Sequence, residues 1–134
     1  MLAWLLGEPA GRAVRGLLGE AEAVVASDLT VLESHRALTR GAVEAAFSEA
    51  RAAALRAYLD RAAAHWILLG VADAILQRAR RPFPLEPVRT LDAIHLASAL
   101  LALESVPDLR LLSLDTRVRR NAKALGMAIE PPSV

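Results

Sequence analysis

Apolar residues follow two alternating patterns along the chain. Segments in which they return every three or four positions predict amphipathic helices, and short apolar runs predict strands. We predict two N-terminal helices on either side of residues 7–11, then helices at 30–38, 43–64, 72–81, 91–103 and 116–125, and strands at 23–26, 66–69, 109–114 and 127–129. Because helices separate the strands, we expect an α/β fold in which a parallel sheet is covered on both faces.

Glycine and proline mark the boundaries between these elements. The sequence Gly-Glu-Pro-Ala-Gly at residues 7–11 predicts a turn, and Gly41 is expected to stop the third helix. Three prolines at positions 82, 84 and 87 predict an extended loop, and Gly126 is a suitable residue to close the last helix. No repeat or linker divides the chain, so we expect residues 1–134 to form one domain.

Composition excludes several classes of protein. Apolar residues make up 54% of the 134 residues and charged residues 23%, which excludes a disordered chain. The absence of cysteine excludes disulfides and thiolate zinc sites. A net charge of +1 means that any nucleic-acid site must come from local clustering of arginines. No signal peptide or apolar run of about 18 residues is present, so we expect a cytoplasmic protein without membrane contact.

Three carboxylates occupy positions where parallel strands end or helices begin. Glu33 and Asp115 each follow a predicted strand, and Asp92 begins the most apolar predicted helix. Ligands of open parallel sheets collect at the carboxyl ends of the strands, so we expect the three acids to face one crevice. Clustered carboxylates repel one another, and a hard divalent cation such as Mg²⁺ relieves this repulsion. Such an ion can activate water against a phosphodiester.

Each acid also has a purely local explanation. Thr30 and Glu33 fit the spacing of a capping box. The negative charge of Asp92 near a helix start interacts favourably with the helix dipole. Asp115 fits the N-cap position of the following helix. Spacing alone leaves both explanations open for all three residues.

Several segments of the chain resemble conserved blocks of one protein family. They are residues 27–33 (SDLTVLE) with Ala37 and Leu38, residues 89–100 (RTLDAIHLASAL), residues 112–115 (LSLD) with Asn121, Ala122, residues 125–127 and Pro131, and the turn at 7–11. These blocks resemble those of PIN-domain proteins, and within that family the VapC toxins of bacterial toxin–antitoxin pairs. The resemblance implies a three-layer α/β/α domain with a parallel sheet. It also implies a Mg²⁺- or Mn²⁺-dependent endoribonuclease that is dimeric and silenced by a small antitoxin.

The resemblance assigns roles to individual residues. Glu33, Asp92 and Asp115 match the family's second, third and fourth acids, and Ser113 matches a hydroxyl residue two positions before the last acid. The first acid, which ends the central strand of the family's sheet, has no match. We expect that strand and its Asp to lie before Met1, so that this chain has a gap in its sheet and cleaves RNA weakly.

Further residues are candidates for supporting roles. His95 lies one helical turn after Asp92 and is either a ligand or general base or, by its apolar neighbours, a buried structural histidine. An arginine cluster directly after Asp115 is either a phosphate-binding patch or a solvated helix face. Its members are Arg117, Arg119 and Arg120.

We therefore predict a metal-dependent endoribonuclease of a type II toxin–antitoxin pair. Its expected partners are RNA (a tRNA or rRNA), a cognate antitoxin and a second copy of the chain, bound through apolar helices. The alternative is a degenerate PIN-like module that binds antitoxin or RNA without cleavage.

Overall fold

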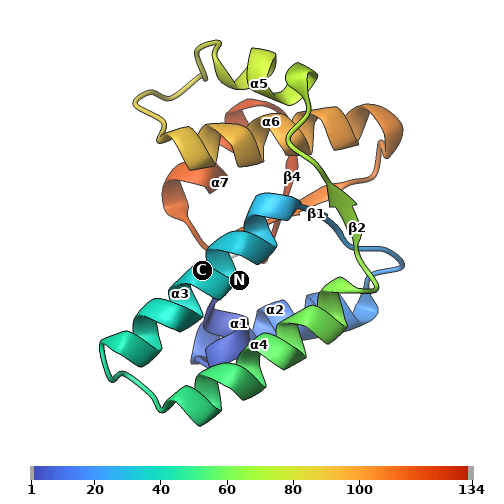
Figure 1. Cartoon of the computed structure of the whole chain (residues 1–134). Coiled ribbons are helices and arrows are strands. Elements are labelled where there is room, and N and C mark those ends of the chain that lie inside the picture. The colour runs from blue at the N-terminus through green and yellow to red at the C-terminus, as the bar shows by residue number, and fades with distance from the viewer. Residues whose placement is uncertain (1, 133–134) are drawn as a thin grey trace. The chain divides into compact units, whose positions relative to one another are not determined.

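The structure is a computed structural model that describes residues 2–132 and shows helices alternating with short parallel strands (Figure 1). In chain order the elements are α1 (Leu2–Leu6), α2 (Pro9–Glu20), β1 (Val25–Ser27), α3 (Asp28–Val43), α4 (Glu49–Ala63), β2 (Ile67–Leu69), α5 (Asp73–Ala79), α6 (Thr90–Ser105), β3 (Arg110–Leu112), α7 (Thr116–Ala124) and β4 (Ala128–Glu130). The predicted α/β class is confirmed. The chain divides into two compact units, Met1–Leu69 and Gly70–Val134. None of the described helices has the length and apolar character needed to cross a membrane.

The described strands form two separate parallel pairs, one in each unit. β1 pairs with β2, and Val25 lies opposite Ile67. β3 pairs with β4, and Arg110 lies opposite Ala128. The strand positions agree with the sequence prediction to within about two residues at most ends.

In the unit Met1–Leu69, α3 and α4 lie side by side (Figure 1). Leu38 of α3 and Leu59 of α4 are fully buried. Trp4 of α1 packs against Tyr58 with ring centroids 5.3 Å apart and against Trp66 with centroids 6.1 Å apart. Aliphatic and aromatic packing therefore holds this unit together.

Two helix boundaries in this unit differ from the sequence prediction. The expected stop at Gly41 is wrong, because α3 continues to Val43. A Cβ atom at Gly41 would lie 2.5 Å from Cζ of Phe47, so glycine lets the ring pack closely against the helix there. The single helix expected over 43–64 is also wrong: α4 begins only at Glu49, where the Ser48 hydroxyl accepts a hydrogen bond from the main-chain N–H of Arg51 (3.2 Å).

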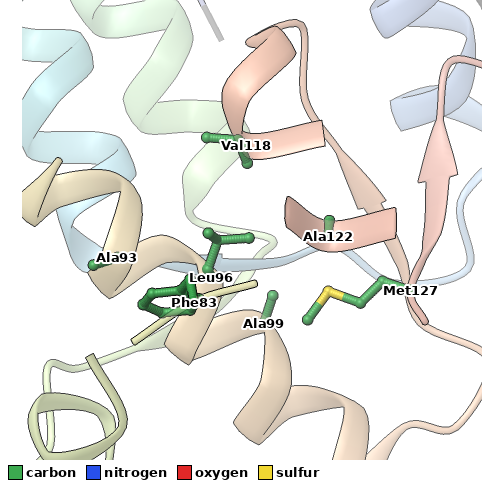
Figure 2. Close-up of a cluster of buried hydrophobic side chains, with 7 residues drawn as sticks. All are labelled: Phe83, Ala93, Leu96, Ala99, Val118, Ala122 and Met127. Carbon is green, nitrogen blue, oxygen red and sulfur yellow. The ribbon is translucent and has the colours of Figure 1, made fainter. Parts of the chain in front are cut away.

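In the unit Gly70–Val134, the core lies between α6, α7 and the segment before α6 (Figure 2). Its buried members are Phe83, Ala93, Leu96, Ala99, Val118, Ala122 and Met127. Leu96 is fully buried, and the guanidinium of Arg78 lies 4.4 Å from the centroid of the Phe83 ring. This core fixes the start of α6 and the start of α7, which carry two of the candidate acids.

The proline-rich segment before α6 is held by side-chain hydrogen bonds. The buried amide of Asn121 accepts the main-chain N–H of Leu85 and donates to its carbonyl oxygen, both at 2.9 Å. The Glu86 carboxylate accepts the N–H groups of Phe83 (2.9 Å) and Val88 (2.6 Å). The predicted extended loop is confirmed, and these bonds give it a defined path into α6.

Candidate functional site

Glu33 lies in the second turn of α3 and is half-buried. The helix begins at Asp28, with Ser27 as its N-cap: the Ser27 hydroxyl accepts the N–H of Leu29 (3.3 Å). Thr30 is therefore already inside the helix, and the capping-box explanation of Glu33 is wrong.

Asp92 is the third residue of α6 and is half-buried. The N-cap residue, Arg89, makes no side-chain capping bond. The negative charge of Asp92 in the first turn interacts favourably with the helix dipole at this end. His95 follows one turn later and is half-buried rather than buried. Asp92 and His95 thus lie near each other on one helix, as their spacing predicts.

Asp115 caps α7 and lies three residues after the last residue of β3. Its Oδ1 atom accepts the main-chain N–H groups of Arg117 (2.7 Å) and Val118 (3.2 Å), which confirms the predicted N-cap. The hydroxyl of Ser113 accepts the N–H of Asp115 itself (3.2 Å). Asp115 is exposed, so a carboxylate with a fixed orientation faces solvent at the carboxyl end of a strand.

The three candidate acids come from different units. Asp92 and Asp115 belong to Gly70–Val134, and Glu33 belongs to Met1–Leu69. Carboxylate oxygens are the ligands that Mg²⁺ prefers, so the residue types suit that ion. Within each unit, however, the described residues bring no three carboxylate or imidazole groups together at metal-binding geometry.

The arginines after Asp115 have different surroundings. Arg117 and Arg120 are exposed on α7 and stay candidates for contacts with RNA phosphates. Arg119 is half-buried, and its guanidinium donates to four carbonyl oxygens, at Ser113 (2.8 Å), Glu130 (3.1 Å), Pro131 (2.6 Å) and Pro132 (3.4 Å). Main-chain acceptors thus engage both terminal nitrogens of Arg119, which favours a structural role, and phosphate binding by Arg119 stays a prediction.

A groove of about 760 Å³ runs between α5 and α6 within the second unit. Its lining is mainly apolar, with Arg78, Arg81 and Glu104 among its charged members. None of the three candidate acids lines this groove, so it is a separate feature of the unit.

Sequence reasoning does not assign the structural roles of two residues in this region, Arg119 and Asn121. The sequence groups Arg119 with its neighbouring arginines, and Asn121 is only one residue of a motif. The acceptors of Arg119 lie as far as 13 residues along the chain, and Leu85 lies 36 residues from Asn121. A local pattern carries no signal for such distant partners.

The chain matches the PIN domain over residues 1–124. It is 45% identical over 94 residues to "Ribonuclease VapC46" of Mycobacterium tuberculosis (strain ATCC 25618 / H37Rv), an alignment that covers 63% of this chain and 70% of that protein. It is 37% identical over 60 residues to "Ribonuclease VapC35" of Mycobacterium tuberculosis (strain CDC 1551 / Oshkosh), which covers 45% of this chain and 44% of that protein. The chain belongs to the PIN-domain family, as its sequence motifs predict.

Proposed function

We propose that this protein is an endoribonuclease of a toxin–antitoxin pair that depends on Mg²⁺ or Mn²⁺. The observation that carries the proposal is the PIN-domain match over residues 1–124, which contains Glu33, Asp92 and Asp115. The similarity to two proteins named ribonucleases supports RNA as the substrate. The defined orientation of Asp115 and the first-turn position of Asp92 support a site built from these acids.

The proposed roles of the residues follow from their chemistry. A divalent cation, when bound, supplies water activation and charge stabilisation. Glu33, Asp92 and Asp115 provide hard oxygen ligands, and the Ser113 hydroxyl holds the main chain of Asp115 in place. Exposed arginines on α7 attract the phosphates of the RNA. His95, one turn after Asp92, supports that acid on the same helix.

We also propose that the chain forms a homodimer and binds a small antitoxin in the cytoplasm. Large apolar side chains that face solvent support an interface of this kind: Val43 is 81% exposed, and Leu32 and Ile67 are each 55% exposed. Light scattering at tens of micromolar in the absence of antitoxin tests the dimer. The mass of two chains is expected, and the mass of one chain would contradict it.

The test of the enzymatic proposal is cleavage of purified tRNA and rRNA with Mg²⁺ or with EDTA. Two forms are compared. One is the 134-residue chain. The other, called the extended form, carries an added N-terminal strand that ends in Asp-Thr-Ser. The extended form is expected to cleave and to stop in EDTA, and the shorter form to cleave weakly. Asp92→Asn in the extended form is expected to abolish cleavage, because an amide is a poor ligand for Mg²⁺. Cleavage that survives both EDTA and Asp92→Asn would contradict the proposal.

A second candidate is a PIN-like module that binds RNA or antitoxin without cleaving RNA. It is favoured by one observation, that neither unit alone gathers three potential ligands among its described residues. RNA binding without cleavage by the extended form, measured with the same tRNA and rRNA, would favour this candidate.

A further inference from the structure

The guanidinium of Arg119 binds two segments that lie apart in the sequence, at residue 113 and at residues 130–132. Nη1 donates to the carbonyl oxygens of Ser113, directly after β3, and of Glu130, in β4. Nη2 donates to the carbonyl oxygens of Pro131 and Pro132, which follow β4. Hydrogen bonds from a charged donor are about twice as strong as neutral ones. One side chain of α7 therefore ties the end of β3 to the end of the described chain.

Arg119 also holds both ends of the turn that presents Asp115. Its main-chain N–H donates to the carbonyl oxygen of Asp115 (2.9 Å), and its side chain folds back to the carbonyl oxygen of Ser113 (2.8 Å). Inside the turn, the Ser113 hydroxyl accepts the N–H of Asp115, and Asp115 Oδ1 accepts two N–H groups of α7. The orientation of the Asp115 carboxylate is thus set by a hydrogen-bond network that includes Arg119.

We propose that Arg119 is a positioning residue, which fixes the Asp115 carboxylate by anchoring its turn to residues 130–132 and does not itself contact RNA. Arginine suits this role, because its planar group carries five donors in a fixed fork, whereas lysine offers one compact ammonium. The geometric part of the proposal stands on the hydrogen bonds alone. Its catalytic consequence rests on the proposed ribonuclease function.

Amide hydrogen exchange measured by NMR tests the geometric part. In Arg119→Ala, exchange at the Arg117 and Val118 amides, which Asp115 caps, is expected to accelerate about tenfold relative to amides in the middle of α6. Arg110→Ala is the matched control, because Arg110 binds the exposed side of the same strand pair through Glu130 Oε1 (3.0 Å). It is expected to leave both amides unchanged. Equal exchange at these amides in the two variants would overturn the proposal.

If Arg119→Ala does not fold, Arg119→Lys is measured in its place, because it keeps the positive charge. Arg119→Lys retains the charge but loses the fork, so it is expected to accelerate exchange at the same two amides to a smaller extent. Unchanged exchange at both amides in Arg119→Lys and Arg119→Ala would overturn the proposal.

Steady-state kinetics of the extended form test the catalytic part. Arg119→Ala is expected to lower kcat by about 10²-fold, because a misplaced catalytic group costs that much, and to leave KM and its salt dependence unchanged. Millimolar guanidinium is expected to restore part of kcat in Arg119→Ala and to do nothing in Arg110→Ala. A higher KM with a shallower salt slope would assign Arg119 to phosphate binding and overturn the proposal.

The two proposals fail in different ways. Absence of cleavage in every form would contradict the proposed function, and the exchange comparison would still decide whether Arg119 fixes the turn. Cleavage with an unchanged kcat in Arg119→Ala would support the function and overturn the role of Arg119.

Discussion

The two compact units hold their candidate acids in different ways. In Gly70–Val134, polar side chains reach distant main-chain groups beside the acids: Arg119 binds four carbonyl oxygens, and Asn121 binds both main-chain groups of Leu85. In Met1–Leu69, the helix of Glu33 has a local serine cap, buries Leu38, and contacts α4 through His35 Nε2 and Asp60 Oδ1 (2.7 Å). Apolar packing tolerates rearrangement, whereas satisfied polar networks specify one geometry. The bonds around Asp115 therefore specify one geometry for its turn.

Substitution of one buried leucine in each unit tests whether the units unfold together. Leu96→Ala and Leu59→Ala each remove a fully buried side chain and are expected to cost about 2–5 kcal/mol of unfolding free energy. Because we predict one domain over residues 1–134, both variants should lower the midpoint of the same thermal transition in calorimetry. A transition that splits in two in either variant would contradict the single domain.

Removal of the side-chain amide of Asn121 tests how much its hydrogen bonds to Leu85 stabilise the second unit. Asn121→Ala leaves the N–H and carbonyl of Leu85 without their partner and is expected to cost about 1–3 kcal/mol in urea unfolding. Lys123→Ala, at an exposed position of the same helix, is the control and should change stability by less than about 0.5 kcal/mol. Equal stability of the two variants would show that the loop before α6 does not depend on Asn121.

A pair of glycine substitutions tests the packing of the first unit. Alanine stabilises most helix interiors relative to glycine. Gly16→Ala in α2 should add about 0.5–1 kcal/mol, because the new Cβ would meet no atom within 4 Å beyond its chain neighbours and the nearby helix backbone. Gly41→Ala in α3 should instead cost about 1–3 kcal/mol, because its Cβ would meet the Phe47 ring. Thermal unfolding midpoints compare the two. If Gly41→Ala stabilises as much as Gly16→Ala, the ring is free to move and the packing argument is wrong.

The sequence predicts the local position of the acids better than the lengths of the helices. Asp115 follows a short apolar strand and precedes a helix with Gly126 beyond its end, so neighbouring residues are enough to predict its N-cap role. The break before Ser48 is hidden in the sequence, because the surrounding residues are mostly alanine and other good helix formers. The role of Gly41 is hidden too, because its close neighbour, Phe47, is apparent only when the helix and the following loop pack together.

Long-range contacts set the limit of sequence reasoning for the site. The carbonyl acceptors of Arg119 and the partner of Asn121 lie on other elements, and no periodicity or cap signal connects them. Motif resemblance could group Glu33 with Asp92 and Asp115, because the family supplies that link. Periodicity, capping and the geometry within each unit do not link Glu33 to the other two acids.

The most direct measurement of the central claim is RNA cleavage by the extended form carrying Asp115→Asn. Asparagine caps a helix as well as aspartate does, so α7 and the thermal midpoint should be preserved. We predict a fall in Mg²⁺-dependent cleavage of at least about 10²-fold, because the carboxylate is lost while the cap remains. EDTA-sensitive cleavage at the rate of the unsubstituted protein would show that Asp115 only caps its helix, and would contradict the account.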